Sequence, residues 1–181
     1  KDNIAARSYT VPTPIQDQTI PLILAGRDIV GIANTGTGKT AAFLIPFINK
    51  VLADRSQKAL IVAPTRELAA QIEEELGAFA KGLGIYCVLC IGGVGMGRQV
   101  SGLRQNHSVV IGTPGRLKDL VKRGTLRLSD FHTIVLDEVD RMLDIGFIHD
   151  IKYLISFLPR DRQSLFFSAT VSREINEIIQ S

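Results

Sequence analysis

Short apolar runs alternate along this chain with segments in which apolar residues recur every three or four positions. Six runs have the length of buried strands, and they cover residues 29–33, 59–63, 86–91, 109–111, 133–136 and 164–167. Helical spacing is clearest in residues 68–79 and 147–158, with shorter helical patterns after Thr113 and Thr170. This alternation predicts βαβ units, so we expect an α/β fold of three layers, with a mainly parallel central sheet flanked by helices.

Three connections share one position relative to the predicted elements. Pro64 and Thr65, Thr113 and Pro114, and residues 168–170 each follow a strand and precede a helix. Helix capping by Ser or Thr, or proline in the first turn, explains any one of them taken singly. In a parallel sheet, however, all such connections lie at the carboxyl edge, where open α/β sheets bind ligands. Their shared edge favours a binding site.

Residues 33–40 are a candidate phosphate cradle, because Ala-Asn-Thr-Gly-Thr-Gly-Lys-Thr stands between a strand and a helix. Glycines in such a loop permit positive φ and let backbone N–H groups face an anion. Lys39 is expected to reach the β and γ phosphates and Thr40 to ligate Mg²⁺. A glycine-rich turn that binds nothing is the alternative, but strand, turn and helix all agree with a P-loop. The expected nucleotide-binding residues here are Thr35, Gly36, Thr37, Gly38, Lys39 and Thr40.

Two adjacent acids, Asp137 and Glu138, follow the apolar run 133–136. Asp137 is expected to project from a strand end towards the P-loop and its Mg²⁺, as a Walker-B aspartate does. Glu138 is then placed to orient or deprotonate the attacking water. Acids at the start of a helix also complement the helix dipole without any further role. The P-loop makes the catalytic interpretation the stronger one, with Lys39, Asp137 and Glu138 as the catalytic residues.

Composition is that of one globular domain of 181 residues, with 45% hydrophobic and 22% charged residues. The net charge of +3 is compatible with a nucleic-acid partner but does not require one. No run approaches the ~18 apolar residues of a membrane span, and no signal peptide is recognisable. We therefore expect a soluble, cytoplasmic protein without a membrane partner. The missing initiator methionine and the absence of a tail suggest a fragment of a longer polypeptide.

The cysteines and histidines carry little functional signal. Cys87 and Cys90 lie in an apolar run and have no second pair, which predicts buried, reduced thiols rather than a zinc or redox site. His107, His132 and His149 have no partners at metal-ligand spacing, and we expect each of them at the surface or in a loop.

Taken together, these motifs resemble the first RecA-like domain of the DEAD-box ATP-dependent RNA helicases, over essentially the whole chain. They occur in the family's order: residues 9–16 (Q motif), the P-loop, residues 64–69 (motif Ia), Gly92 and Gly93 with Gln99, residues 113–116 (motif Ib), residues 137–140 (motif II) and residues 168–170 (motif III). Ala33, where a strict P-loop has glycine, is the usual residue in this family.

The resemblance implies roles for residues outside the phosphate cradle. Gln16 would read the adenine edge and Tyr9 would stack on the ring, which selects ATP. Ser168 and Thr170 would hydrogen-bond Asp140 and so couple the ATP site to movement between domains. Sequence-independent RNA binding, chiefly to phosphates and 2′-hydroxyls, would use the residues of the Ia, glycine and Ib motifs. These are Pro64, Thr65, Arg66, Gly92, Gly93, Thr113, Pro114, Gly115 and Arg116.

Two positions depart from the family pattern. Val139 stands where the family name requires alanine, which adds two methyl groups beside the acids. Ser8 precedes Tyr9 where glycine is usual, and the aromatic residue expected further upstream would lie before Lys1.

The family also implies a second RecA-like domain with motifs IV to VI and the arginines that complete the ATP site. An arginine finger contributes roughly 10³ to 10⁵ in rate. We therefore expect this domain alone to be a monomer that binds ATP or ADP with Mg²⁺, binds RNA weakly and hydrolyses almost nothing. One alternative is a non-catalytic RNA-binding or docking module with a vestigial nucleotide site, against which the intact motif residues speak. Another is a DNA helicase or other P-loop motor, which the Q motif and residues 64–69 disfavour.

Overall fold

The computed structural model describes residues 2–7 and 9–180, so the departure noted at Ser8 lies outside the described part. All six apolar runs form strands of one sheet, in the order β1-β6-β5-β2-β4-β3. Every pairing is parallel, with Ile29 opposite Leu165 and Ala59 opposite both Val109 and Thr133. The strands are β1 (Ile29–Ile32), β2 (Ala59–Val62), β3 (Cys87–Cys90), β4 (Val109–Gly112), β5 (Thr133–Leu136) and β6 (Gln163–Ser168).

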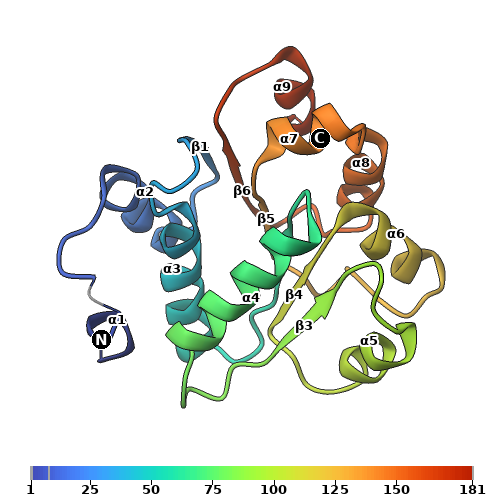
Figure 1. Cartoon of the computed structure of the whole chain (residues 1–181), viewed down its shortest axis with the longest axis horizontal. Coiled ribbons are helices and arrows are strands. Elements are labelled where there is room, and N and C mark those ends of the chain that lie inside the picture. The colour runs from blue at the N-terminus through green and yellow to red at the C-terminus, as the bar shows by residue number, and fades with distance from the viewer. Residues whose placement is uncertain (1, 8, 181) are drawn as a thin grey trace.

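Helices cover both faces of this sheet and complete the three predicted layers (Figure 1). Side chains alternate between the faces, so Leu60 and Val62 of β2 enter one core cluster while Ala59 and Ile61 enter the other. The first face carries α5 (Met96–Leu103), α6 (Pro114–Lys122), α7 (Val139–Ile145), α8 (Ile148–Ser156) and α9 (Arg173–Ile179). The second carries α2 (Pro14–Leu24), α3 (Lys39–Ala53) and α4 (Arg66–Phe79), with α1 (Asp2–Ala5) against α4.

The expected helix caps are formed at only one of the three connections. Thr65 caps α4, because its Oγ1 accepts a hydrogen bond from Leu68 N at 3.2 Å. Thr113 is the N-cap of α6, but within the described residues its side chain makes no cap hydrogen bond. The cap of α9 is Ser172, not Thr170, and Ser172 Oγ accepts from Ile175 N at 3.3 Å. The side chains of Thr113 and of residues 168–170 therefore do not cap the helices that follow them.

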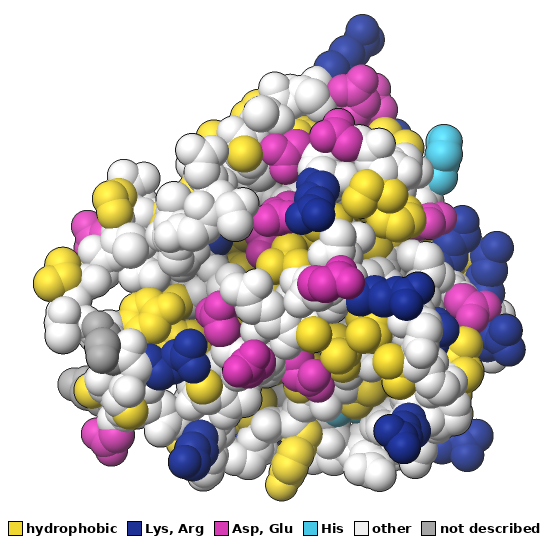
Figure 2. All heavy atoms as spheres, in the orientation of Figure 1, with side chains coloured by type: hydrophobic (Ala, Val, Ile, Leu, Met, Phe, Trp, Pro, Cys, Tyr) yellow, Lys and Arg dark blue, Asp and Glu magenta, His cyan; other side chains and the backbone are white. Residues whose placement is uncertain are grey.

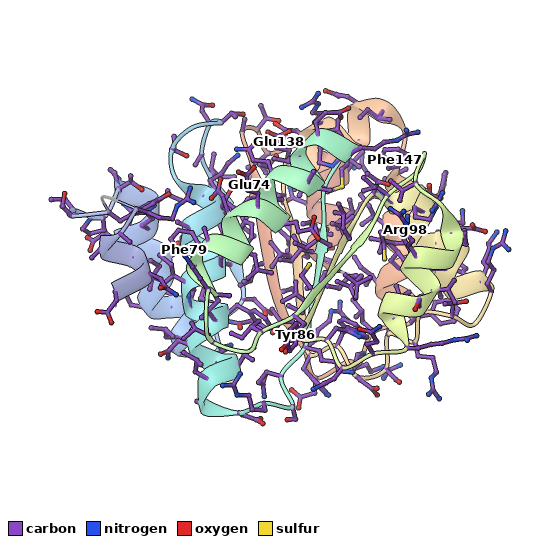
Figure 3. The ribbon with its side chains drawn as sticks, turned by 60° about the horizontal axis from the view of Figure 1, so that its bottom comes forward. Glu74, Phe79, Tyr86, Arg98, Glu138 and Phe147 are labelled. Carbon is purple, nitrogen blue, oxygen red and sulfur yellow. The ribbon has the colours of Figure 1, made fainter. Side chains whose placement is uncertain are left out.

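The connections after the strands meet at one edge, as predicted. Ala33 N donates to Ser168 O at 3.0 Å, and Asp137 N donates to Val62 O at 3.0 Å. These bonds join the ends of β1 and β6, and of β5 and β2. The P-loop and the acids therefore emerge at the same edge, on either side of the end of β6. Figure 3 shows Glu138 and Phe147 near this edge, whereas Tyr86, at the amino end of β3, lies away from it.

Two expectations about cysteine and histidine have different outcomes. Both cysteines are free thiols, but only Cys90 is fully buried, whereas Cys87 is partly buried. Burial raises the pKa of Cys90 to about 12 and also raises that of Cys87. His107 lies in the loop before β4, in agreement with a surface or loop position, but only 8% of it is exposed and its ring centroid lies 6.2 Å from that of Phe131. No helix in the described part of the chain has the length and apolar character to span a bilayer.

Candidate functional site

The P-loop backbone requires glycine at two positions. Gly36 has φ +83° and Gly38 has φ +87°, a left-handed conformation that side chains disfavour. A Cβ on Gly38 would also overlap the amide of Gln16, which packs against the loop. Gly38 is the N-cap of α3, so the loop leads directly into the unpaired N–H groups of a 15-residue helix. This is the geometry of an anion cradle.

Lys39 is buried at the base of this loop, with 6% exposure. Its Nζ donates to Ala33 O at 3.0 Å and lies 3.9 Å from Asp137 Oδ1. Thr37 Oγ1 donates to Asn34 O at 2.7 Å, which folds the loop onto itself. The ammonium group is thus held between the first residue of the loop and the first acid of motif II. At this position it could form an ion pair with a phosphate bound in the loop.

Asp137 is a buried carboxylate with one basic neighbour. Only 2% of it is exposed, and this burial raises its pKa to about 6, although the nearby Lys39 acts in the opposite direction. Glu138 N donates to Asp137 Oδ1 at 2.9 Å and fixes the carboxylate's orientation. Mg²⁺ in proteins is typically held by one or two carboxylates together with waters and substrate phosphates. The hard oxygens of Asp137 and Thr40 beside the P-loop fit that ion.

Glu138 is the one non-glycine residue with positive φ among those described, at 52°. Such a conformation is uncommon outside glycine and costs energy. The Glu138 carboxylate accepts from Thr35 Oγ1 at 3.3 Å and from Arg141 Nη1 at 3.2 Å. It borders a cavity of about 310 Å³ whose lining residues are Thr35, Lys39, Glu138, Asp140, Arg141, Asp144 and Ala169.

Arg141 and Asp144 were not anticipated from the sequence as members of this cavity. The sequence offers one signal for Arg141, which lies three residues after Glu138. At this spacing, two side chains of one helix can contact each other. In the structure, the partly exposed Arg141 side chain forms an ion pair with the Glu138 carboxylate.

Asp140 links motif II to the segment after β6, and the predicted contacts are present. Thr170 Oγ1 donates to Asp140 Oδ2 at 3.4 Å, and the backbone N–H groups of Ala169 and Thr170 donate to the same oxygen at 3.1 and 3.2 Å. Ser168 Oγ accepts from Asp140 N at 3.2 Å. Four hydrogen bonds thus join Asp140 of motif II to residues 168–170.

Gln16 and Tyr9 both have partners in the structure. Gln16 is 2% exposed, its Nε2 donates to Gly38 O at 3.1 Å, and its Oε1 accepts from Thr13 N at 3.0 Å. Gln16 therefore touches the P-loop directly, which links residues 22 positions apart. The ring of Tyr9 packs edge-on against Phe79, with centroids 5.6 Å apart. The proposed adenine contacts of both residues stay predictions.

A second cavity, of about 500 Å³, opens at the same edge of the sheet. It is lined by seven of the predicted RNA-binding residues, namely Pro64, Thr65, Arg66, Gly92, Thr113, Gly115 and Arg116. Gly93 adjoins it, since a Cβ there would overlap the Arg66 guanidinium and its φ is +78°. Pro114 is buried in the first turn of α6 rather than facing the cavity.

The two arginines of this cleft are held differently. Arg66 is exposed and extends over Gly92 and Gly93. Arg116 donates from Nη1 to Gln99 Oε1 at 3.0 Å and to Val94 O at 3.3 Å. Gln99 is 3% exposed and is itself anchored to Ile91 O at 2.8 Å, so a buried amide positions Arg116.

Sequence reasoning did not anticipate Glu67, Asp119 and Phe147 in this cleft. Phe147 lies in the loop before α8, as its N-cap, whereas its helical period predicts a core position within the helix. It is partly buried and joins the cleft because α8 packs against α6. Nothing in the local pattern distinguishes such a residue from an ordinary core position.

Comparisons with known proteins agree with these features. The family model described as DEAD/DEAH box helicase matches residues 13–178. The DEAD-box ATP-dependent RNA helicase CshA of Streptococcus pneumoniae is 46% identical over 176 residues, which are 97% of this chain and 34% of that protein. This chain thus spans about a third of the length of this curated relative.

Two solved structures share the fold. A DEAD box protein from the hyperthermophile Methanococcus jannaschii has a TM-score of 0.94 at 38% identity, over 99% of this chain and 50% of its own. A hypothetical ATP-dependent RNA helicase from Sulfolobus tokodaii has a TM-score of 0.91 at 35% identity, over 99% of this chain and 52% of its own. With the family model matching most of its length, this chain belongs to the DEAD/DEAH box helicase family.

Proposed function

We propose that this chain is the ATP-binding domain of an ATP-dependent RNA helicase, which couples ATP binding and hydrolysis to RNA binding and local unwinding. The observation that carries the proposal is the position of both cavities at one edge of one sheet. A nucleotide cradle with two acids lies on one side, and a cleft with two arginines lies on the other. The similarity to the DEAD-box ATP-dependent RNA helicase CshA supports it.

In this proposal, the chain's residues bind and orient the reacting groups. Lys39 exchanges its bond to Ala33 O for a bond to the terminal phosphates, while the amides at the start of α3 hold the remaining oxygens. Thr40 and Asp137 would hold Mg²⁺, which would supply positive charge next to the phosphates. Glu138 accepts a hydrogen bond from the attacking water and orients it. Gln16 and Tyr9 recognise adenine.

The second cleft holds the RNA backbone in the proposal. Arg66 and Arg116 supply charge-assisted hydrogen bonds to phosphates, and the glycines permit close approach of the strand. These contacts read no base edges, so binding is independent of sequence. Asp140, Ser168 and Thr170 communicate between the nucleotide and a second RecA-like domain of the complete protein, which closes over both cavities.

The test replaces Glu138 by Gln in the complete protein. The amide keeps the size of the side chain but cannot accept a proton, so RNA-stimulated ATP turnover should fall by roughly 10² to 10⁴ while ATP affinity stays within a few-fold. Turnover is measured by phosphate release with saturating RNA, and separately with DNA of the same sequence. Unchanged turnover would favour a docking module instead, and equal stimulation by DNA would contradict recognition of the 2′-hydroxyl.

A further inference from the structure

The charge of this chain is unevenly distributed. Residues 98–127 contain seven of its 21 Lys and Arg residues but only one of its 18 Asp and Glu residues. Because the whole chain has a net charge of +3, the remainder is net negative. Figure 2 shows Lys and Arg side chains gathered at the right edge of the molecule, over α6 and the loop that follows it. Clustering of this kind is the electrostatic footprint of a polyanion site.

A cavity of about 640 Å³ lies within this basic region, at the edge opposite the sites described above. Its walls come from segments that precede strands: Lys58 before β2, His107 before β4 and Phe131 before β5. Arg104 and Arg123 enter it from the C-terminal ends of α5 and α6. Arg127 comes from the connection between α6 and β5.

The cations of this cavity outnumber its anions. Arg123 pairs with Asp119 at 3.0 Å, and among the described residues Asp130 is the one acidic residue in the cavity wall. Among the described residues, no carboxylate lies within ion-pair distance of Lys58, Arg104 or Arg127. His107 adds no charge near neutral pH, because burial and the nearby Lys58 lower its pKa, although a hydrogen bond to Gln105 O opposes this.

Favourable interaction with helix dipoles accounts for part of this arrangement. A cation at a helix C-terminus is stabilised by the negative end of the dipole, which applies to Arg104 and Arg123. It does not apply to Lys58, which precedes a strand and lies over the Phe131 ring, or to Arg127, an exposed residue beyond the end of the helix. Three segments that are distant in sequence, at residue 58, residue 104 and residues 123–127, bring four cations to one hollow, and self-repulsion opposes that placement unless an anion binds there.

Helix α6 connects this hollow to the proposed RNA cleft. Its first turn carries Arg116 in the cleft, exposed Lys122 lies near its end, and its C-cap Arg123 lies in the hollow. Nine residues at 1.5 Å each separate the two ends by about 13 Å, the rise of about four stacked nucleotides of one strand. One RNA strand can thus contact both sites.

We propose that this cavity is a second phosphate-binding site, which holds the RNA strand that extends beyond the cleft along α6. The inference rests on the proposed function, because RNA must first occupy the cleft. Cations at both ends of α6, Arg116 in the cleft and Arg123 in the cavity, favour an RNA backbone that reaches both sites over an isolated acidic peptide segment; between them Asp119 pairs with Arg123. The site increases the affinity for long RNA without reading its sequence, since its donors match phosphate oxygens.

The test compares a single-stranded RNA of six nucleotides with one of sixteen, measured by fluorescence anisotropy on the complete protein with bound ATP analogue. Replacing Arg104 and Arg127 by Glu should weaken binding of the longer RNA by at least about tenfold and reduce its salt slope by about two. Binding of the shorter RNA should change less than about twofold. The change of Arg27 and Lys81 to Glu is the matched control, because both are exposed cations outside the cavity, and it should alter neither affinity.

The outcomes separate this inference from the proposed function. If the unaltered protein binds neither RNA, both are wrong. If it binds the shorter RNA and the charge reversal leaves the longer one unaffected, the second site alone is wrong. A poly-glutamate peptide that binds more tightly than the longer RNA, and loses binding on charge reversal, would show that the cavity serves acidic protein segments. The Arg104 and Arg127 to Gln variant, with an unchanged unfolding temperature and about half the effect, excludes misfolding as the cause.

Discussion

At the scale of single residues, the site is defined by groups placed where they are costly. Asp137 is buried beside Lys39, and Glu138 adopts a backbone conformation that favours glycine. Strain and desolvation of this kind concentrate at functional sites, where a ligand offsets them. The presence of these residues in these conformations therefore favours a functional nucleotide site over a vestigial nucleotide site.

Replacing Asp137 by Asn should stabilise the free protein near pH 7.5, by roughly 1 to 3 kcal/mol. Burial raises the carboxyl pKa from 3.8 to about 6, so the folded state binds the proton more tightly than the unfolded state. Stability from this group is therefore present below pH 3.8 and is lost as pH rises through 6. Urea unfolding at pH 7.5 and pH 4 measures it, and the gain should shrink at pH 4.

The matched control is Asp54→Asn. Asp54 is exposed, and hydrogen bonds from Gln57 and Ser56 lower its pKa, so its replacement should bring no stability at pH 7.5. A gain in both variants would show that general surface charge, and not the burial of Asp137, is responsible.

At the scale of elements, the position of Val139 in the first turn of α7 accounts for a valine in motif II. Val139 is 1% exposed and packs in the core cluster beneath α7, while the flanking acids face the cavity. Helical geometry turns successive side chains by 100°, so one position can serve the core while its neighbours serve the site. The extra methyl groups thus affect packing rather than the chemistry of the acids.

Val139→Ala should lower the free energy of unfolding by roughly 1 to 2 kcal/mol, because it removes two buried methyl groups and leaves a small cavity. ATP affinity should be unchanged. Denaturant unfolding and nucleotide titration measure the two effects, with Val51→Ala in the other core cluster as a comparison of equal burial. A loss of nucleotide affinity at position 139 alone would show that the valine shapes the site directly.

At the scale of the whole molecule, the two cavities at the carboxyl edge are open to solvent. We propose that residues 1–181 form one ATP-binding domain and that a second domain supplies the opposing arginines. The basic cavity at the other edge extends the proposed nucleic-acid surface around α6.

Separated from its partner domain, this chain should bind ADP with Mg²⁺ but turn over ATP at least about 10³-fold more slowly than the complete protein, because the transition-state arginines are missing. Steady-state phosphate release with and without RNA measures turnover, and calorimetry confirms that nucleotide still binds. RNA-stimulated turnover close to that of the complete protein would contradict the requirement for a second domain.

The sequence by itself determined the strands, the parallel α/β architecture, the P-loop and the acids of motif II. Each of these depends on a local hydrophobic period or on a short motif of neighbouring residues. Only the tertiary structure decided that Gln99 positions Arg116, that Phe147 joins the cleft and that His107 is buried. It also brought Lys58, Arg104 and Arg127 to one cavity. These contacts depend on which strands become neighbours, and hydrophobic periodicity contains no information about strand order.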